Sequence, residues 1–178
     1  MGRKSISLRL DRVKNKATAQ EIIGEWRESW DYDTRTAVKY LFNALENRDV
    51  DMAKYSASKL LPLTQKRLGA LKNVADALIN KDWHDENDAP PHLAKHQSAI
   101  AQQIDSARSK AAVQEVMAEW QESWEYDMRH NVQRIFGALA KGDLDMARRV
   151  TEELLPITRD QLDALEAVAA ALMYKTLA

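Results

Sequence analysis

An aspartate that follows two tryptophans occurs twice in the chain, with the same spacing each time. The two sets are Trp26, Trp30 and Asp33, and, 94 positions later, Trp120, Trp124 and Asp127. At about 100° per helical residue, Asp33 falls within the apolar arc that contains the two tryptophans. A carboxylate there needs a partner, because an unpaired buried charge is costly. One interpretation is a structural contact in the core, in which each Asp accepts from a Trp indole N–H, from Thr64 or Thr158, or from an Arg.

The second interpretation of these residues is a small-ligand pocket. Aromatic faces and carboxylates together suit a cationic ligand or a metal ion. Tryptophans at four-residue spacing are themselves usually core residues, because a large ring fills the space between helices. The sequence leaves open whether Asp33 and Asp127 are buried structural contacts or line a pocket, and it identifies no ligand or cofactor.

A polar stripe lies on the opposite face of the same predicted helix, and it also occurs twice. Its members are Glu25, Glu28, Tyr32 and Arg35 in the first copy and Glu119, Glu122, Tyr126 and Arg129 in the second. Exposed ion pairs within a helix contribute only tenths of a kcal/mol, so stability gives little reason to repeat these identities. Tyr and Arg are enriched at binding hot spots. We expect the eight residues to bind a protein partner or a second copy of the chain; the alternative is a merely solvated face.

Both sets belong to a long internal repeat. Residues 5–80 recur as residues 99–174 without a gap, and 29 of the 63 pairs between residues 18–80 and 112–174 are identical. Apolar residues recur at intervals of three and four, which predicts amphipathic helices. We expect a tandem duplication of a three-helix unit: a short helix, a helix of about 28 residues, and a long helix kinked by Pro62 or Pro156.

Local signals predict where the long helices begin and end. Thr18-Ala-Gln-Glu21 is a capping box that would start the first one. Asn47-Arg48 and Lys141-Gly142 would end the long helices, and Asp49 and Asp143 would be the N-caps of the next. The apolar phase continues through Pro62, which predicts one kinked helix rather than two.

These elements predict an all-α protein with two helical repeats. The first repeat spans residues 1–80, a Pro-containing acidic linker spans residues 81–98, and the second repeat spans residues 99–178. A lone hairpin of amphipathic helices leaves one apolar face open. We therefore expect the repeats to pack together as a pseudo-two-fold helical bundle.

Three histidines of the linker offer a further candidate site. They are His84, His92 and His96, and the last two are spaced as ligands on one helix face. The second copy has no equivalent, and acidic linkers are common. We therefore expect no metal site there.

Two carboxylate pairs allow an enzymatic interpretation. Glu25-Trp-Arg-Glu28 and Glu46-Asn-Arg-Asp49 form an ExxE and an ExxD pair. This pattern resembles that of the all-α nucleoside triphosphate pyrophosphatases of the MazG and dimeric dUTPase group. The resemblance implies that the four carboxylates would bind magnesium against the substrate phosphates. The second copy departs from the pattern, because Ala140 stands in the position of Glu46.

Composition limits the remaining function classes. With 45% hydrophobic and 30% charged residues, the chain matches an ordinary globular protein. It has no Cys, which excludes disulfides and thiolate metal sites. No apolar run approaches the roughly 18 residues of a membrane span, so we expect a cytoplasmic protein without membrane contact. Residues 1–17 are basic, but a solvated helix face is a better explanation than nucleic acid.

The sequence thus favours a non-enzymatic protein-binding or regulatory module that presents its duplicated polar face to a protein partner. Two alternatives remain. One is the magnesium-dependent nucleotide hydrolase of the resemblance, and the other is a small-ligand receptor that uses the Trp and Asp positions.

Overall fold

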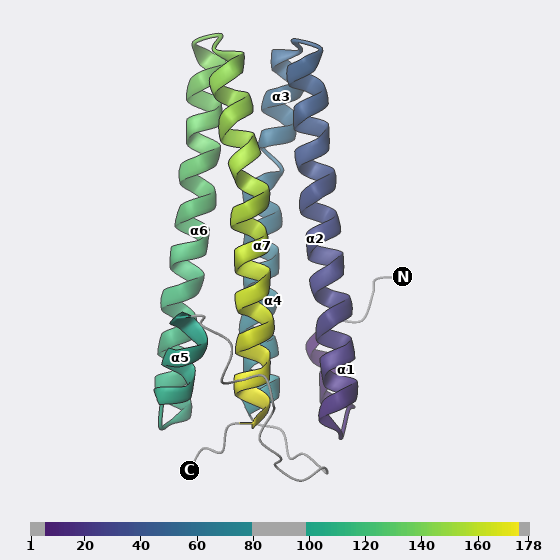
Figure 1. Cartoon of the computed structure of the whole chain (residues 1–178), viewed down its shortest axis with the longest axis vertical. Coiled ribbons are helices and arrows are strands. Elements are labelled where there is room, and N and C mark those ends of the chain that lie inside the picture. The colour runs from purple at the N-terminus through teal and green to yellow at the C-terminus, as the bar shows by residue number, and fades with distance from the viewer. Residues whose placement is uncertain (1–5, 80–98, 175–178) are drawn as a thin grey trace. The chain divides into compact units, whose positions relative to one another are not determined.

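The computed structural model describes residues 6–79 and 99–174, and all the regular structure in these ranges is helical (Figure 1). The helices are α1 (Ile6–Asp11), α2 (Lys16–Glu46), α3 (Val50–Ala57), α4 (Leu60–Ile79), α5 (Ala99–Ser106), α6 (Lys110–Ala140) and α7 (Leu144–Tyr174). They pack as a helical bundle, which confirms the all-α prediction. The predicted linker at residues 81–98 lies outside the described residues.

The chain divides into two compact units, and each unit takes residues from both halves of the sequence. Unit 1 comprises Met1–Glu28, Gly69–Gln121 and Leu162–Ala178, and unit 2 comprises Ser29–Leu68 and Glu122–Gln161. Each unit therefore has its own core, to which helices of both halves contribute. Among the described helices, none combines the length and the apolar composition needed to span a membrane.

Helix α2 begins earlier than the capping box predicts, and α6 begins at the matched position. Asn15 Oδ1 accepts a hydrogen bond from Thr18 N at 2.8 Å, and Ser109 Oγ accepts one from Ala112 N at 3.1 Å. Asn and Ser are good N-caps because their side chains satisfy a free N–H of the first turn. The prediction of Thr18 as the cap is therefore wrong, and α2 and α6 each have 31 residues.

The ends of α2 and α6 agree with the sequence. Arg48 and Gly142 have φ angles of 56° and 70°, in the left-handed region. The next residues donate back into the helix, Asp49 N to Ala44 O and Asp143 N to Ala138 O, both at 2.9 Å. This is the hydrogen bond of a Schellman motif. The left-handed position is occupied by an arginine in the first half and by a glycine in the second. Only the arginine is strained by the positive φ angle.

The two aspartates that follow these turns cap the next helices, as predicted. Asp49 Oδ1 accepts from Met52 N, and Asp143 Oδ1 accepts from Met146 N, both at 3.0 Å. Each carboxylate also lies at the positive end of its helix dipole. The caps therefore fix the starts of α3 and α7.

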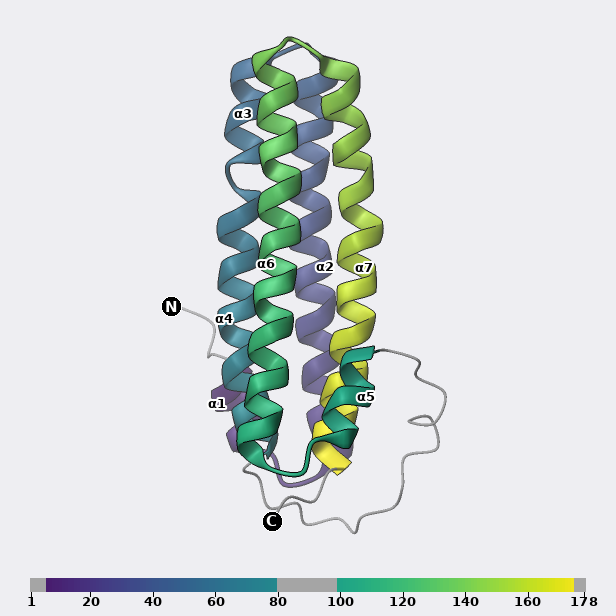
Figure 2. The same cartoon turned by 90° about the vertical axis from the view of Figure 1, so that its left-hand side faces the viewer.

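The segments that contain the prolines differ between the two halves: α7 is one continuous helix, whereas the first half has two helices, α3 and α4 (Figure 2). Pro156 lies inside the continuous helix α7, which confirms the kinked-helix prediction as far as continuity is concerned. The first half is broken into α3 and α4, with Pro62 in the first turn of α4, so the prediction of one helix is wrong there. Ser58 explains why the helix breaks in the first half and not in α7, since its hydroxyl donates to Tyr55 O at 2.5 Å. Such a local bond competes with helix continuation, whereas the matched residue in α7 is Glu152, a good helix former.

The core of unit 2 is built from matched positions of the two halves. Val38, Leu41, Ala44, Leu45, Ala53 and Leu60 are buried in it, and so are the residues 94 positions later, Val132, Ile135, Ala138, Leu139, Ala147 and Leu154. Small residues alternate with large ones along each helix, which lets neighbouring helices approach closely. The apolar positions that the helical periodicity identified are thus buried in both halves.

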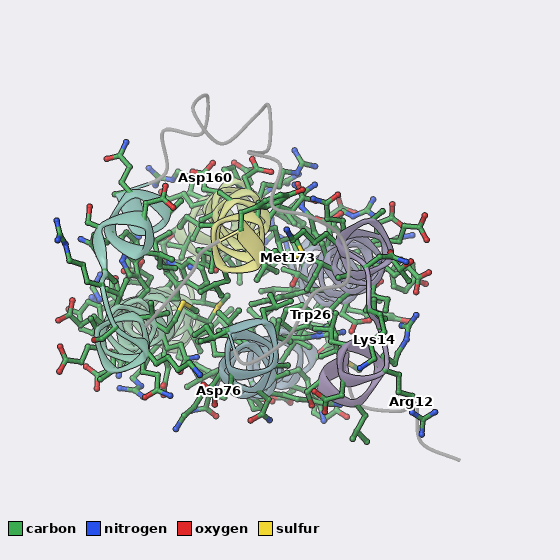
Figure 3. The ribbon with its side chains drawn as sticks, turned by 90° about the horizontal axis from the view of Figure 1, so that it is seen from below. Arg12, Lys14, Trp26, Asp76, Asp160 and Met173 are labelled. Carbon is green, nitrogen blue, oxygen red and sulfur yellow. The ribbon has the colours of Figure 1, made fainter. Side chains whose placement is uncertain are left out.

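Unit 1 has a separate core that includes one of the tryptophans. Trp26 on α2 and Met173 on α7 are 8% and 2% exposed, and both point inward between the helices, whereas Arg12 points outward (Figure 3). Two polar bonds attach the short helices to their long neighbours. Arg9 on α1 pairs with Glu25 on α2 at 2.7 Å, and Trp120 on α6 donates to Gln103 on α5 at 2.9 Å.

Candidate binding surfaces

The eight residues of the polar stripe are all exposed. Glu25, Glu28 and Glu119 belong to unit 1, and Tyr32, Arg35, Glu122, Tyr126 and Arg129 belong to unit 2. The two tyrosines are 63% and 62% exposed, at matched positions of α2 and α6. An aromatic ring in water contributes little to folding. The prediction that these side chains face outward therefore agrees with their positions.

Some residues of the stripe contact neighbours on their own helix. Arg35 pairs with Asp31 at 2.9 Å, and Arg129 pairs with Glu125 one turn before it at 2.5 Å. On α6, the ring of Tyr126 also lies parallel to that of His130, with 6.0 Å between centroids. Such exposed pairs contribute little to stability, but they hold the arginines and the ring against their own helices.

The tryptophans are mostly core residues. Trp26, Trp30 and Trp124 are buried, and Trp120 is half-buried. The indole of Trp120 donates to a Gln rather than to an aspartate. These rings therefore fill space between helices within their own units, as large apolar side chains usually do.

The two aspartates do not share one environment. Asp33 is 40% exposed and accepts from Arg67 on α4, whose side chain is 14% exposed and also donates to Ser29 at 3.2 Å. Asp127 is exposed. The residue that points into the core beside Asp33 is Thr34, at 3% exposure. The structural-contact interpretation, with an Arg as donor, thus describes Asp33 alone.

The position that matches Arg67 explains this asymmetry. It is occupied by Gln161, which is buried and carries no charge. A carboxylate at position 127 has no matching cation to approach, and remaining in water preserves its hydration. The sequence repeat alone did not show this, because the aspartates match while their potential partners do not.

A groove of about 540 Å³ lies beside Asp33 in unit 2. It runs between α2 and the α3–α4 segment and is lined by Asp33, Thr36, Ala37, Tyr40, Met52, Tyr55, Ser56, Lys59 and Leu63. Tyr40, Tyr55 and Met52 are 64%, 58% and 49% exposed. The ammonium of Lys59 lies 4.6 Å from the centroid of the Tyr55 ring, within cation–π range. This groove was not predicted from the sequence.

The matched positions of the second half carry charge instead of aromatic rings. Arg134 and Arg149 stand where the first half has Tyr40 and Tyr55. Arg134 donates to Glu153 at 3.1 Å and to Asn131 at 3.3 Å, and thus bridges α6 and α7. A comparison of the two copies for differences rather than for identities would have found the tyrosines.

The carboxylates implied by the pyrophosphatase resemblance have other roles. Glu25 pairs with Arg9, and Asp49 caps α3. Glu28 and Glu46 belong to different units. In the part of the chain that the structure describes, no three His, Cys, Asp or Glu residues are grouped so as to hold a metal ion. The three linker histidines, His84, His92 and His96, lie outside that part.

Comparisons with protein-family models, with curated proteins and with solved structures found no match to this chain.

Proposed function

We propose that the chain is a non-enzymatic protein-binding module, and that the groove beside Tyr40 and Tyr55 holds an apolar side chain of a protein partner. The observation that carries the proposal is the convergence of three large, exposed side chains on one groove with an apolar floor. Tyrosine is enriched at interface hot spots, because its rigid ring contributes contact area at a low cost in conformational entropy.

The second half supports this interpretation by contrast. Its hairpin places Arg134 and Arg149 at the positions of the two tyrosines, and its core residues match those of the first hairpin. Charged residues at these two positions are thus compatible with a packed helical hairpin. Because folding does not require aromatic rings at these positions, we infer that binding is the reason for Tyr40 and Tyr55.

Charge indicates the chemistry of the partner. Asp33 is neutralised by Arg67, and Lys59 is the other residue of the groove lining that is charged at neutral pH. Residues 29–68 contain seven basic and five acidic residues. A complementary partner would place an aromatic or aliphatic anchor in the groove and an acidic residue beside Lys59.

The polar stripes of α2 and α6 are part of the same proposal. Their exposed tyrosines and arginines would extend the contact along each helix or contact a second partner molecule.

We further propose that the two halves arose by tandem duplication and are related by a pseudo-two-fold axis. The matched helices, caps and core positions support this. After duplication, the first hairpin would have kept or gained the aromatic groove, and the second would have replaced it with ion pairs.

A peptide-display selection against the purified chain tests the proposed function. Enriched peptides should share an aromatic or aliphatic residue next to Asp or Glu. A synthetic peptide of that sequence should bind the wild type, and Tyr40→Arg with Tyr55→Arg should weaken its affinity at least tenfold, or about 1.4 kcal/mol. These substitutions introduce the residues of the second half, so thermal unfolding should change little.

A matched control is Gln133→Arg, which introduces the same charge at an exposed position of α6 outside the groove and the polar stripes, and it should leave the affinity of that peptide within about twofold. Failure to enrich any peptide motif, or an unchanged affinity in the double variant, would refute the proposed groove.

A further inference from the structure

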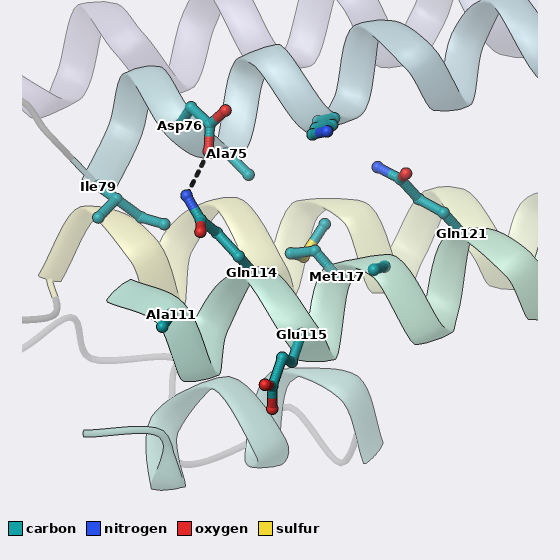
Figure 4. A pocket seen from close by; sticks show the side chains of 10 residues that line it. Ala75, Asp76, Ile79, Ala111, Gln114, Glu115, Met117 and Gln121 are labelled. Atoms are coloured by element: carbon teal, nitrogen blue, oxygen red, sulfur yellow. Dashed lines mark hydrogen bonds between the residues drawn. The ribbon is translucent and has the colours of Figure 1, made fainter. Parts of the chain in front are cut away.

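A second cavity, also of about 540 Å³, lies in unit 1 between α4 and α6 (Figure 4). Its apolar lining consists of Ala75 and Ile79 from α4 and Ala111, Met117 and Ala118 from α6. Its polar lining consists of Lys72 and Asp76 from α4 and Gln114, Glu115 and Gln121 from α6. An apolar wall with a few polar groups is typical of a small-ligand site.

One polar group of this lining has an unmet hydrogen-bonding requirement. Gln121 Nε2 is buried, and it has no hydrogen-bond partner within residues 6–79 and 99–174. A buried N–H group without an acceptor costs free energy, and most such groups in folded proteins are paired. Figure 4 shows the Gln121 side chain extending from α6 along the cavity. An acceptor atom of a bound molecule would satisfy this donor.

The contact between α2 and α7, also in unit 1, is the matched counterpart of the contact between α4 and α6, and ion pairs close it. There, Arg27 donates to Glu166 at 3.2 Å and also pairs with Asp163. The residues 94 positions away from these three are Gln121, Lys72 and Gly69. A Cβ atom added to Gly69 would meet no other atom within 4 Å. The contact between α4 and α6 therefore has two hydrogen-bond donors, Lys72 and Gln121. The matched contact between α2 and α7 has two carboxylates and an arginine at this place.

The opposite end of the cavity carries negative charge. Asp76 Oδ1 accepts from Gln114 Nε2 at 3.4 Å, and Asp76 has a further interaction besides this one. A carboxylate has about four acceptor positions, so these contacts are compatible with an added ammonium. Glu115 also lines the cavity, but Figure 4 shows its carboxylate directed toward α5. Asp76 lies one helical turn after Lys72, and Gln114 lies about two turns before Gln121, so the two ends are separated by roughly 6 to 10 Å at 1.5 Å per residue.

We propose that this cavity binds a small zwitterion that carries a carboxylate and an ammonium group at the two ends of a short apolar chain. The carboxylate accepts from Gln121 Nε2 and pairs with Lys72, and the ammonium pairs with Asp76. The apolar chain lies against Ala75, Met117 and Ala118. The site is distinct from the groove in unit 2, and the proposal does not depend on the protein-binding function.

Titration calorimetry with three defined compounds tests the site. They are 6-aminohexanoate, hexanoate, which lacks the ammonium, and hexylamine, which lacks the carboxylate. The chain should bind 6-aminohexanoate saturably and at least tenfold more tightly than either of the other two. Equal affinity for hexanoate would overturn the proposal, and so would the absence of saturable 6-aminohexanoate binding.

Two variants locate the site. Gln121→Arg combined with Lys72→Glu recreates the ion pair of the matched contact between α2 and α7, so it should abolish 6-aminohexanoate binding while leaving the thermal midpoint of unfolding as high as in the wild type. Asp76→Asn should weaken 6-aminohexanoate about tenfold and leave hexanoate unaffected. Retained binding in the double variant, or an equal effect of Asp76→Asn on both compounds, would overturn the assignment to this cavity.

Discussion

Arg67 on α4 donates to Asp33 on α2, so the carboxylate that lies next to two core tryptophans in the sequence is neutralised by a neighbouring helix. Arg67 is largely buried, whereas Asp33 is partly in contact with solvent. This pair stands beside the groove in unit 2, and it removes one negative charge from the lining of that groove.

The first prediction concerns this pair. Arg67→Gln, which introduces the residue found at position 161, should lower the free energy of unfolding by about 0.5 to 1 kcal/mol, because solvent already screens Asp33. Urea unfolding measures the change. Asp127→Asn is the control and should stay within about 0.5 kcal/mol of the wild type, since Asp127 is exposed. A larger loss for Asp127→Asn than for Arg67→Gln would contradict the asymmetry of the two aspartates.

The second prediction concerns the turns after α2 and α6. Arg48 and Gly142 both have positive φ angles. Arg48→Gly should raise the free energy of unfolding by about 0.5 to 1 kcal/mol by relieving strain that glycine does not suffer, and Gly142→Arg should lower it by a similar amount. Thermal or urea unfolding of both variants tests the pair. Effects of the same sign would show that the left-handed turns are wrongly assigned.

The third prediction concerns the break between α3 and α4. Ser58→Glu with Lys59→Glu introduces the residues that α7 carries at its matched positions, and it removes the Ser58 hydroxyl from Tyr55 O. The two helices should then join, because Glu favours helix continuation. Hydrogen exchange at residues 58–60 should slow at least several-fold, while exchange in α7 stays unchanged. Unaltered exchange at residues 58–60 would assign the break to Pro62 alone.

The fourth prediction concerns the polar stripe. Glu28→Lys and Glu122→Lys reverse the charge of two exposed residues on α2 and α6. Each single variant should unfold within about 0.5 kcal/mol of the wild type. If the stripes contact the partner, the combined variant should weaken binding of a partner protein identified from the selected peptide motif at least threefold. Wild-type affinity in the combined variant would limit the interface to the groove.

Much of the fold could be predicted from the sequence, because helix formation depends on local signals and on periodicity. The positions of Leu41, Leu60 and their counterparts follow from three-and-four spacing, and the Asp49 cap follows from residue type. The start of α2 was misplaced because Asn15 offers an equally good cap three residues before Thr18. The break near Ser58 could not be predicted from the apolar residues, because their helical spacing continues through it. It depends on the hydrogen bond from the Ser58 hydroxyl to Tyr55 O, which competes with helix continuation.

The candidate sites were less predictable, since they depend on differences between the two copies. Repetition identified Tyr32 and Tyr126 as outward-facing residues. It also suggested equal roles for Asp33 and Asp127, although the position of Arg67 has no cation in the second copy. The groove at Tyr40 and the cavity at Gln121 arise where one copy lacks an ion pair that the other has. Such features depend on contacts between helices, which sequence spacing does not report.

The most direct test of the proposed function is site-specific photo-crosslinking. A benzophenone amino acid is placed at position 40 in one sample and at the matched position 134 in another, and each is irradiated with the selected peptide. We predict a peptide adduct from position 40, competed away by unlabelled peptide, and none from position 134. Equal adducts at both positions, or an adduct at position 134 alone, would contradict the groove beside Tyr40 and Tyr55 as the protein-binding site.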